Sequence, residues 1–191
     1  MRITYRRALA ALVLSITAAP ALSAQGMAMD GRTTMVGGQA MYPAKDIVDN
    51  AVNSADHTTL VAAVKAAGLV ETLKSKGPFT VLAPTNAAFA MLPAGAVESL
   101  LEPGNKAALT KVLTYHVIAG NFGSEAIAKA VRKGGGSVTM KTVAGEALTF
   151  SLNGERNIVV RDAKGGTAGI TIYDVRQSNG VIHVVDRVLM P

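Results

Sequence analysis

The sequence predicts an α+β domain in which helices gather on a largely antiparallel, strongly bent sheet. Apolar residues recur at helical spacing in the first part of the domain, whereas from Val138 onward they alternate as in strands. The final segment, 179–191, opens with an Asn-Gly turn and continues as a β-branched run that is apolar on both faces. Helices first and strands last favour the α+β class, and we expect the last strand to be central to the sheet.

Three short helices are predicted at the start of the domain. The helix over 45–54 is indicated by the spacing of Ile47, Val48, Ala51 and Val52. Asp56 or Thr58 can cap a second helix, which buries the stripe Leu60, Val61, Val64 and Ala67. Gly68 is well placed to end that helix, and a further helical turn is expected over 69–74.

A compact strand is predicted over 79–83, between the Gly77-Pro78 break and Pro84. Thr85 or Asn86 then caps a helix that carries Phe89 inward. Further helices are predicted from Pro93 to Leu101, over 106–113 and over 125–131, with an extended stretch at 115–118. Strands follow near 138–142, 147–152, 158–160 and 169–175, separated by glycine-containing turns.

The N-terminal 42 residues are predicted to lie outside the domain, which we place at 43–191. Arginines 2, 6 and 7 precede an apolar stretch and a small-residue segment that ends at Ala24, the order of a secretory signal peptide over 1–24. We therefore expect export to the periplasm or the cell surface. Residues 25–42 are rich in Gly and Met without periodicity, which indicates a flexible leader.

Composition excludes several classes of function. Removing the predicted signal peptide leaves 16 Lys and Arg against 13 Asp and Glu, a net charge of about +3, and the basic residues are scattered. This pattern does not favour nucleic acid as a partner. Cysteine is absent, which excludes thiol chemistry and cysteine-bound metal. No later apolar stretch is long enough to predict a transmembrane segment.

Three blocks of the sequence resemble the fasciclin domain. They are Gly77-Pro-Phe-Thr-Val-Leu-Ala-Pro-Thr-Asn-Ala-Ala-Phe89, the pair Tyr115-His116, and Asn179-Gly-Val-Ile-His-Val-Val-Asp186. Their order and separation match the family over 43–191. The resemblance implies a wedge-shaped β-sandwich of about seven strands with several packed helices. It also implies a secreted, non-enzymatic module of cell adhesion and matrix interaction that needs no cofactor and binds a protein or glycan partner.

The resemblance also implies where binding occurs. In animal members of the family, adhesion is assigned to a Tyr-His pair with aliphatic flanks and to an Asp-Ile pair ahead of the final strand. These positions correspond here to Tyr115, His116, Val117 and Ile118, and to Tyr173, Asp174 and Val175, where Val replaces the family's Ile. We interpret the remaining marked residues as structural: Phe79, Pro84, Thr85, Asn86, Phe89, His183 and Asp186.

No sequence motif indicates a zinc site or a catalytic serine. The three histidines, His57, His116 and His183, lack the spacing of zinc motifs, and no serine lies in a nucleophile elbow. A histidine in an apolar setting is more often a hydrogen-bonded core residue, which is our interpretation of His116 and His183. Asp186 alternates onto a mostly apolar face, where it would hold a loop or pair with a cation.

Two alternatives to adhesion stay open. The domain could carry a small apolar ligand in a cleft between sheet and helices. The Met-rich leader, with Met27, Met29, Met35 and Met41, could bind Cu(I) through soft thioether sulfurs.

Overall fold

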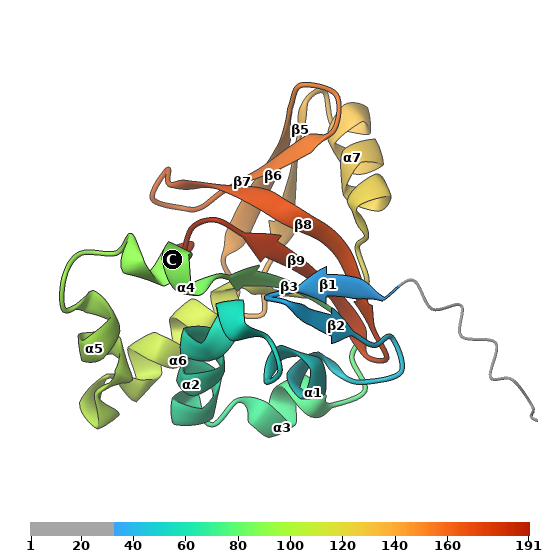
Figure 1. Ribbon diagram of the computed structural model, residues 1–191. Coiled ribbons are helices and arrows are strands. Elements are labelled where there is room, and N and C mark those ends of the chain that lie inside the picture. Colours follow the sequence, from blue (N-terminus) through green and yellow to red (C-terminus); the bar gives the residue numbers. More distant parts are fainter. Residues whose placement is uncertain (1–32) are drawn as a thin grey trace, which may run out of the picture. The chain divides into compact units, whose positions relative to one another are not determined.

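The computed structural model describes residues 33–191, so the predicted signal peptide and residues 25–32 of the predicted leader lie outside it. The helices are α1 (Ile47–Ala51), α2 (Thr58–Ala67), α3 (Val70–Lys74), α4 (Asn86–Ala90), α5 (Ala96–Leu101), α6 (Lys106–Tyr115) and α7 (Ser124–Lys133), with short 3-10 turns η1 (Ala55–His57) and η2 (Pro103–Asn105). The strands are β1 (Thr34–Val36), β2 (Gln39–Met41), β3 (Phe79–Pro84), β4 (Val117–Ala119), β5 (Ser137–Lys141), β6 (Ala147–Asn153), β7 (Asn157–Arg161), β8 (Thr167–Gln177) and β9 (Gly180–Val185) (Figure 1).

Seven strands form one sheet in the order β4-β3-β9-β8-β7-β6-β5. Every neighbouring pair is antiparallel except β3 and β9, which run parallel. The two outer edges of the sheet meet, because Ile118 bridges Thr142 and the Val143 N–H donates to the Val117 carbonyl at 2.7 Å. The fold is therefore a mixed α+β fold whose seven-stranded sheet is nearly closed.

The final strand is an interior strand, as the sequence predicts. All residues of β9 are buried, and it lies between β3 and β8. Its side chains alternate between two cores: Val185 packs with Leu82 and Phe150, whereas Ile182 and Val184 pack on the opposite face of the sheet. The strand ends at Val185, earlier than predicted, since residues 186–191 leave the sheet and only Leu189 returns to the core.

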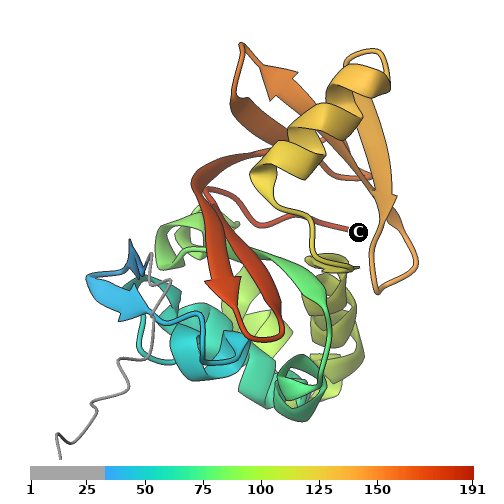
Figure 2. The ribbon, with the colours of Figure 1, turned by 90° about the vertical axis from the view of Figure 1, so that its right-hand side faces the viewer.

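Helices cover the sheet from two sides. Helix α7 lies against β5 and β6, whereas α1, α2, α3 and α6 gather at the other end of the sheet (Figures 1 and 2). Gly68 ends α2 in a left-handed conformation, with φ of 73°, as predicted. Thr85 is the cap of α4, because its hydroxyl accepts from the Ala88 N–H at 3.2 Å.

The N-terminal boundary of the ordered domain differs from the prediction. Residues 34–41, which composition assigns to a flexible leader, form the β1–β2 hairpin instead. Gly37 and Gly38 make its two-residue turn with positive φ values of 57° and 74°. Val36 and Met41 are buried against the sheet, so the hairpin is part of the core. A Gly-Gly pair between short apolar segments is a hairpin signal that the low complexity of the segment hides.

Candidate functional site

The Tyr-His segment lies in the core of the molecule. The exposed fractions of Tyr115, His116, Val117 and Ile118 are 0%, 3%, 7% and 2%, respectively. Helix α6 ends on Tyr115, and β4 begins at Val117, so the pair marks the junction between a helix and an edge strand. These four side chains consequently offer almost no surface to a partner in this conformation.

Tyr115 joins two turns that are distant in sequence. Its hydroxyl donates to the Ala147 carbonyl at 3.0 Å and accepts from the Ala163 N–H at 2.9 Å. Burial raises the pKa of the phenol, so it stays protonated and able to donate. The residue therefore fixes the start of β6 and the turn after β7 against the end of α6.

His116 is a neutral, doubly bonded core residue. Its Nδ1–H donates to the Val112 carbonyl at 2.8 Å, which leaves Nε2 to accept from the Leu189 N–H at 3.0 Å. Burial lowers its pKa from 6.5 to about 4. The Tyr115 and His116 rings meet edge to face, with centroids 6.5 Å apart. His116 thus holds the C-terminal segment onto α6.

The second predicted site is a bulge in β8. Asp174 has a φ of 55°, and the pairing with β9 shifts register on either side of Ile172. The Asp174 carboxylate accepts from the Ser124 N–H at 2.7 Å and from the Ser124 hydroxyl. Tyr173 is half-buried, and its hydroxyl accepts from the Ile158 N–H at 3.1 Å, while Val175 is buried. The bulge turns Asp174 toward the first residue of α7.

His183 connects the two predicted sites. Its Nδ1 accepts from the Asp174 N–H at 3.3 Å, and its Nε2–H donates to the Phe122 carbonyl at 2.9 Å. Burial lowers the pKa of this fully buried imidazole, which agrees with a neutral ring bonded on both nitrogens. Residues 119–123, which follow the Tyr-His segment, are thereby held against Asp174.

This arrangement creates a small surface that we call the loop surface. It consists of Ala119, Asn121, Phe122, Tyr173 and Asp174. Ala119 and Asn121 are exposed, and the other three are partly exposed. Gly120 adopts a φ of 121° and leaves no room for a Cβ, which would lie 2.5 Å from the Phe122 ring. Sequence reasoning missed residues 119–123, although Gly120 and Gly123 mark a constrained loop.

The residues predicted to be structural hold other parts of the fold. Asn86 accepts from the Thr59 N–H at 3.0 Å and donates to the Ala55 carbonyl, which fixes η1 and α2 on α4. Pro84 and Phe89 are buried, and Phe79 is half-buried. Asp186 is exposed rather than buried, because the strand has already ended, and its carboxylate accepts from the Gly169 N–H at 2.7 Å.

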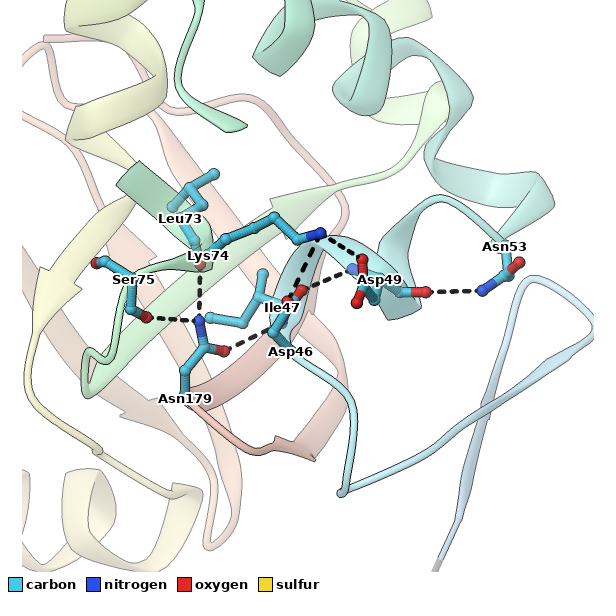
Figure 3. Close-up of polar contacts among 8 residues, drawn as sticks. All are labelled: Asp46, Ile47, Asp49, Asn53, Leu73, Lys74, Ser75 and Asn179. Carbon is cyan, nitrogen blue, oxygen red and sulfur yellow. Dashed lines mark hydrogen bonds and ion pairs between the residues drawn. The ribbon is translucent and has the colours of Figure 1, made fainter. Parts of the chain in front are cut away.

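Asn179 does more than form the predicted turn. Its side chain donates to the Leu73 and Ser75 carbonyls at 2.7 and 3.0 Å and accepts from the Ile47 N–H at 3.0 Å (Figure 3). One buried amide therefore connects α1, the end of α3 and the β8–β9 turn. Beside it, the Lys74 ammonium lies 2.8 Å from the Asp49 carboxylate, and this pairing raises the pKa of Lys74 and lowers that of Asp49.

An apolar cleft lies between the helices and the sheet. Its volume is about 120 Å³, and side chains of the β1–β2 hairpin, α1, α2, α3, β3 and β9 line it. Most of these side chains are aliphatic, for example Met41, Val64, Leu73 and Ile182. The cleft is somewhat smaller than a dry aliphatic cavity of roughly 150 Å³ that binds benzene, so it can take a small apolar group or one end of a longer apolar molecule.

His57 is one of the buried polar residues on the wall of this cleft, with Ser54 and His116. It is 3% exposed, and its Nδ1 lies 2.8 Å from the Ser54 hydroxyl. Its Nε2 has no hydrogen-bond partner, and within residues 33–191 it is the one buried side-chain nitrogen or oxygen atom of which this is true. Burial lowers the pKa of His57. The nearby Ala83 carbonyl opposes this shift, but it does not complete a hydrogen bond with Nε2. In the sequence, His57 lies at helical spacing from Leu60, Val61 and Val64, and this pattern could have predicted that it is buried.

The geometry bears on the metal hypotheses as well. Each histidine of the described chain has its own separate surroundings, and no group of three His, Asp or Glu side chains is close enough there to hold a metal ion. Met41 is buried and Met35 is 58% exposed, so the two lie on opposite faces of the hairpin and cannot share a copper ion. Met27 and Met29 lie outside the described residues. No helix within 33–191 is long and apolar enough to cross a membrane.

Comparison with known sequences gives one consistent match. The model of the family described as Fasciclin domain matches residues 55–191. Protein sll1483 of Synechocystis sp. is 45% identical over 172 residues, which cover 90% of this chain and 88% of that protein. Immunogenic protein MPT70 of Mycobacterium tuberculosis is 35% identical over 74% of this chain and 66% of its own length.

A solved structure has the same fold. It is the FAS1 domain pair from the insect cell adhesion molecule Fasciclin I, which superposes with a TM-score of 0.70 at 16% identity. The match covers 78% of this chain and 52% of that chain, in keeping with one domain against a pair. At this identity the likeness concerns the fold alone.

Proposed function

This chain belongs to the fasciclin domain family, whose members are binding modules associated with adhesion and matrix, and on that premise we propose that it is an exported, non-enzymatic module supporting cell adhesion or cell-envelope and matrix contact. The family is generally non-catalytic. The proposed partner is a protein or a glycan on another surface. Export is proposed from the signal-peptide pattern of residues 1–24.

The observation that supports this function is the way the two predicted sites converge. The Tyr-His segment leads directly into residues 119–123, and His183 and Ser124 attach that loop to Asp174. We propose that the loop surface makes the contact, while Tyr115, His116, Val117, Ile118 and Val175 hold it in place from the core. Partly exposed Phe122 and Tyr173 supply apolar contact area to this surface.

The test is an attachment assay in a strain that lacks the gene and produces defined variants from a plasmid. Asn121→Arg introduces a long charged side chain on the loop surface, where Asn121 is exposed and makes no side-chain hydrogen bond within residues 33–191. Asn153→Arg is the matched control, since Asn153 is exposed near the other end of α7, where Arg132 bonds the Glu155 carbonyl. We expect attachment to fall with Asn121→Arg alone. Equal attachment by both variants would remove the loop surface from the proposal.

A second function is favoured by the apolar cleft, namely carriage of a small apolar ligand. Burial of apolar surface contributes roughly 25 cal/mol per Å² removed from water, so an aliphatic cleft of this size can retain a ligand. Native mass spectrometry of the protein isolated from its own cells should then reveal a bound species. In Ala51→Phe, a phenyl ring added to the half-buried α1 wall should fill the cleft and abolish that species. A wild-type protein that is always empty would contradict carriage.

A third hypothesis, Cu(I) binding by the Met-rich segment, now depends on Met27 and Met29. The buried position of Met41 removes its sulfur from any site shared with Met35. A protein lacking residues 25–32 should lose Cu(I) binding if this hypothesis holds, whereas unchanged binding would end it.

A further inference from the structure

Within residues 33–191, the wall of the apolar cleft contains one buried side-chain polar group whose hydrogen-bonding capacity is not used. Burying a polar group without a partner costs about 1–3 kcal/mol, and proteins rarely tolerate that cost without a reason. His57 Nε2 is such a group, and it belongs to a residue that lines the cleft. The nearby Ala83 carbonyl does not complete a hydrogen bond with Nε2, so a molecule that enters the cleft can supply its partner.

The other polar side chains of the buried wall already have partners. The Ser54 hydroxyl bonds His57 Nδ1, and both nitrogens of His116 are occupied by the Val112 carbonyl and the Leu189 N–H. The Thr114 hydroxyl donates to the Thr110 carbonyl at 2.7 Å. Among the buried side chains that line the cleft within residues 33–191, His57 is thus the one with a polar atom that lacks a partner, and an occupant can gain a directional contact at its Nε2.

We propose that the cleft binds an uncharged, mainly apolar molecule through one hydroxyl or carbonyl group, which hydrogen-bonds His57 Nε2. This inference rests on the second proposed function, carriage of an apolar ligand. A hydroxyl suits either neutral tautomer of His57, because it can donate and accept, whereas a carbonyl requires the proton on Nε2. A carboxylate beside His57 is disfavoured, since the buried wall there is apolar and the lysine of the lining, Lys65, is exposed.

The size of the cleft sets the choice of probes. A cavity of about 120 Å³ is close to the size that accommodates a benzene ring. Phenol and toluene have nearly the same shape and differ in whether a hydroxyl or a methyl group occupies one position. The ratio of their affinities therefore isolates the polar contact from the apolar fit.

The test measures both affinities by calorimetry for wild type, His57→Phe and His57→Gln. His57→Phe removes the polar group, whereas the amide of His57→Gln can reach the position of Nε2. One hydrogen bond contributes about 1 kcal/mol, so the phenol-to-toluene affinity ratio should fall roughly fivefold in His57→Phe and stay near wild type in His57→Gln. In wild type, phenol but not toluene should shift the nitrogen-15 resonance of Nε2.

The possible failures can be told apart. If wild type binds both probes and the ratio is unchanged in His57→Phe, the cleft binds ligands but His57 does not select them, and this inference is wrong. If wild type binds neither probe, carriage and this inference fail together. Because the Nε2 resonance is measured in wild type, its failure to respond to bound phenol overturns the inference even where His57→Phe does not fold.

Discussion

At the scale of single residues, the Tyr-His pair owes its importance to burial. Tyr115 holds two turns through its hydroxyl, and His116 holds the C-terminal segment through Nε2. Neither residue has more than 3% of its surface exposed. A resemblance between sequences gives the position of such residues but not their exposure, because apolar flanks such as Val117 and Ile118 suit a contact surface and a core equally well.

His116 makes stability depend on pH. Its folded pKa of about 4 lies below the unfolded value of 6.5, so the unfolded chain binds more protons between these pH values. The contribution of His116 to the free energy of unfolding is therefore highest above pH 6.5 and falls as the pH drops toward 4. His116→Gln keeps a donor and an acceptor but does not titrate. Between pH 7 and 4, wild type should lose about 3 kcal/mol more than this variant, as urea denaturation can measure.

The control for this prediction lies in the other histidines. Burial also lowers the pKa values of His57 and His183, so His116→Gln should flatten the dependence on pH without removing it. Identical pH dependence in wild type and His116→Gln would show that His116 is not buried as a neutral ring.

At the scale of elements, Asp174 couples the β8 bulge to helix α7. Its carboxylate accepts two hydrogen bonds from Ser124 at the positive end of the helix. Asp174→Ala loses both bonds and also strains a residue at positive φ, so we expect a loss of about 2–3 kcal/mol. Asp174→Asn tolerates this conformation and keeps one acceptor, and it should lose about half as much.

Urea denaturation of both variants tests this coupling, with Arg176→Ala as the control. Arg176 is exposed on the same strand and takes part in no side-chain hydrogen bond or ion pair within residues 33–191. Its truncation should leave stability unchanged. If Asp174→Ala is as stable as Arg176→Ala, the bonds of the Asp174 carboxylate to Ser124 do not stabilise the fold, and this carboxylate is available to a partner.

Asn179 and Lys74 lie side by side but should differ greatly in importance (Figure 3). Asn179→Ala would leave two carbonyls and one N–H without partners in a buried setting, which costs about 3 kcal/mol or more. Lys74→Ala removes an exposed ion pair, which water and salt screen, and it should leave stability nearly unchanged. Thermal unfolding would contradict this ranking if Lys74→Ala lowered Tm as much as Asn179→Ala.

At the scale of the whole molecule, the local features of the sequence were the predictable ones. The alternating apolar positions of 181–185 indicate an interior strand, and Gly68 and Thr85 mark helix ends, because each depends on neighbours in the chain. The four strands predicted between 138 and 175 follow the same alternation, and their observed bounds differ from prediction by at most two residues.

The features that escaped prediction depend on contacts between distant segments. The parallel direction of the β3–β9 pairing and the three bonds of the Asn179 side chain involve residues about a hundred positions apart, where periodicity gives no information. The β1–β2 hairpin was hidden because its stability comes from burying Val36 and Met41 on the sheet, and propensity contributes little. A cleft between sheet and helices is one of the expected ligand sites, but its lining, which includes His57, depends on how these elements pack.

The central claim is that the buried residues hold the loop surface and that its exposed residues bind the partner. One attachment assay with purified protein tests it by comparing Asn121→Arg with Tyr115→Phe, with the attachment of each variant normalised to the amount of folded protein. Tyr115→Phe should lose about 1–2 kcal/mol of stability through the bonds to Ala147 and Ala163 yet attach as wild type when folded. Asn121→Arg should keep wild-type stability and lose attachment. The reverse result, with attachment lost in folded Tyr115→Phe and kept in Asn121→Arg, would contradict the account.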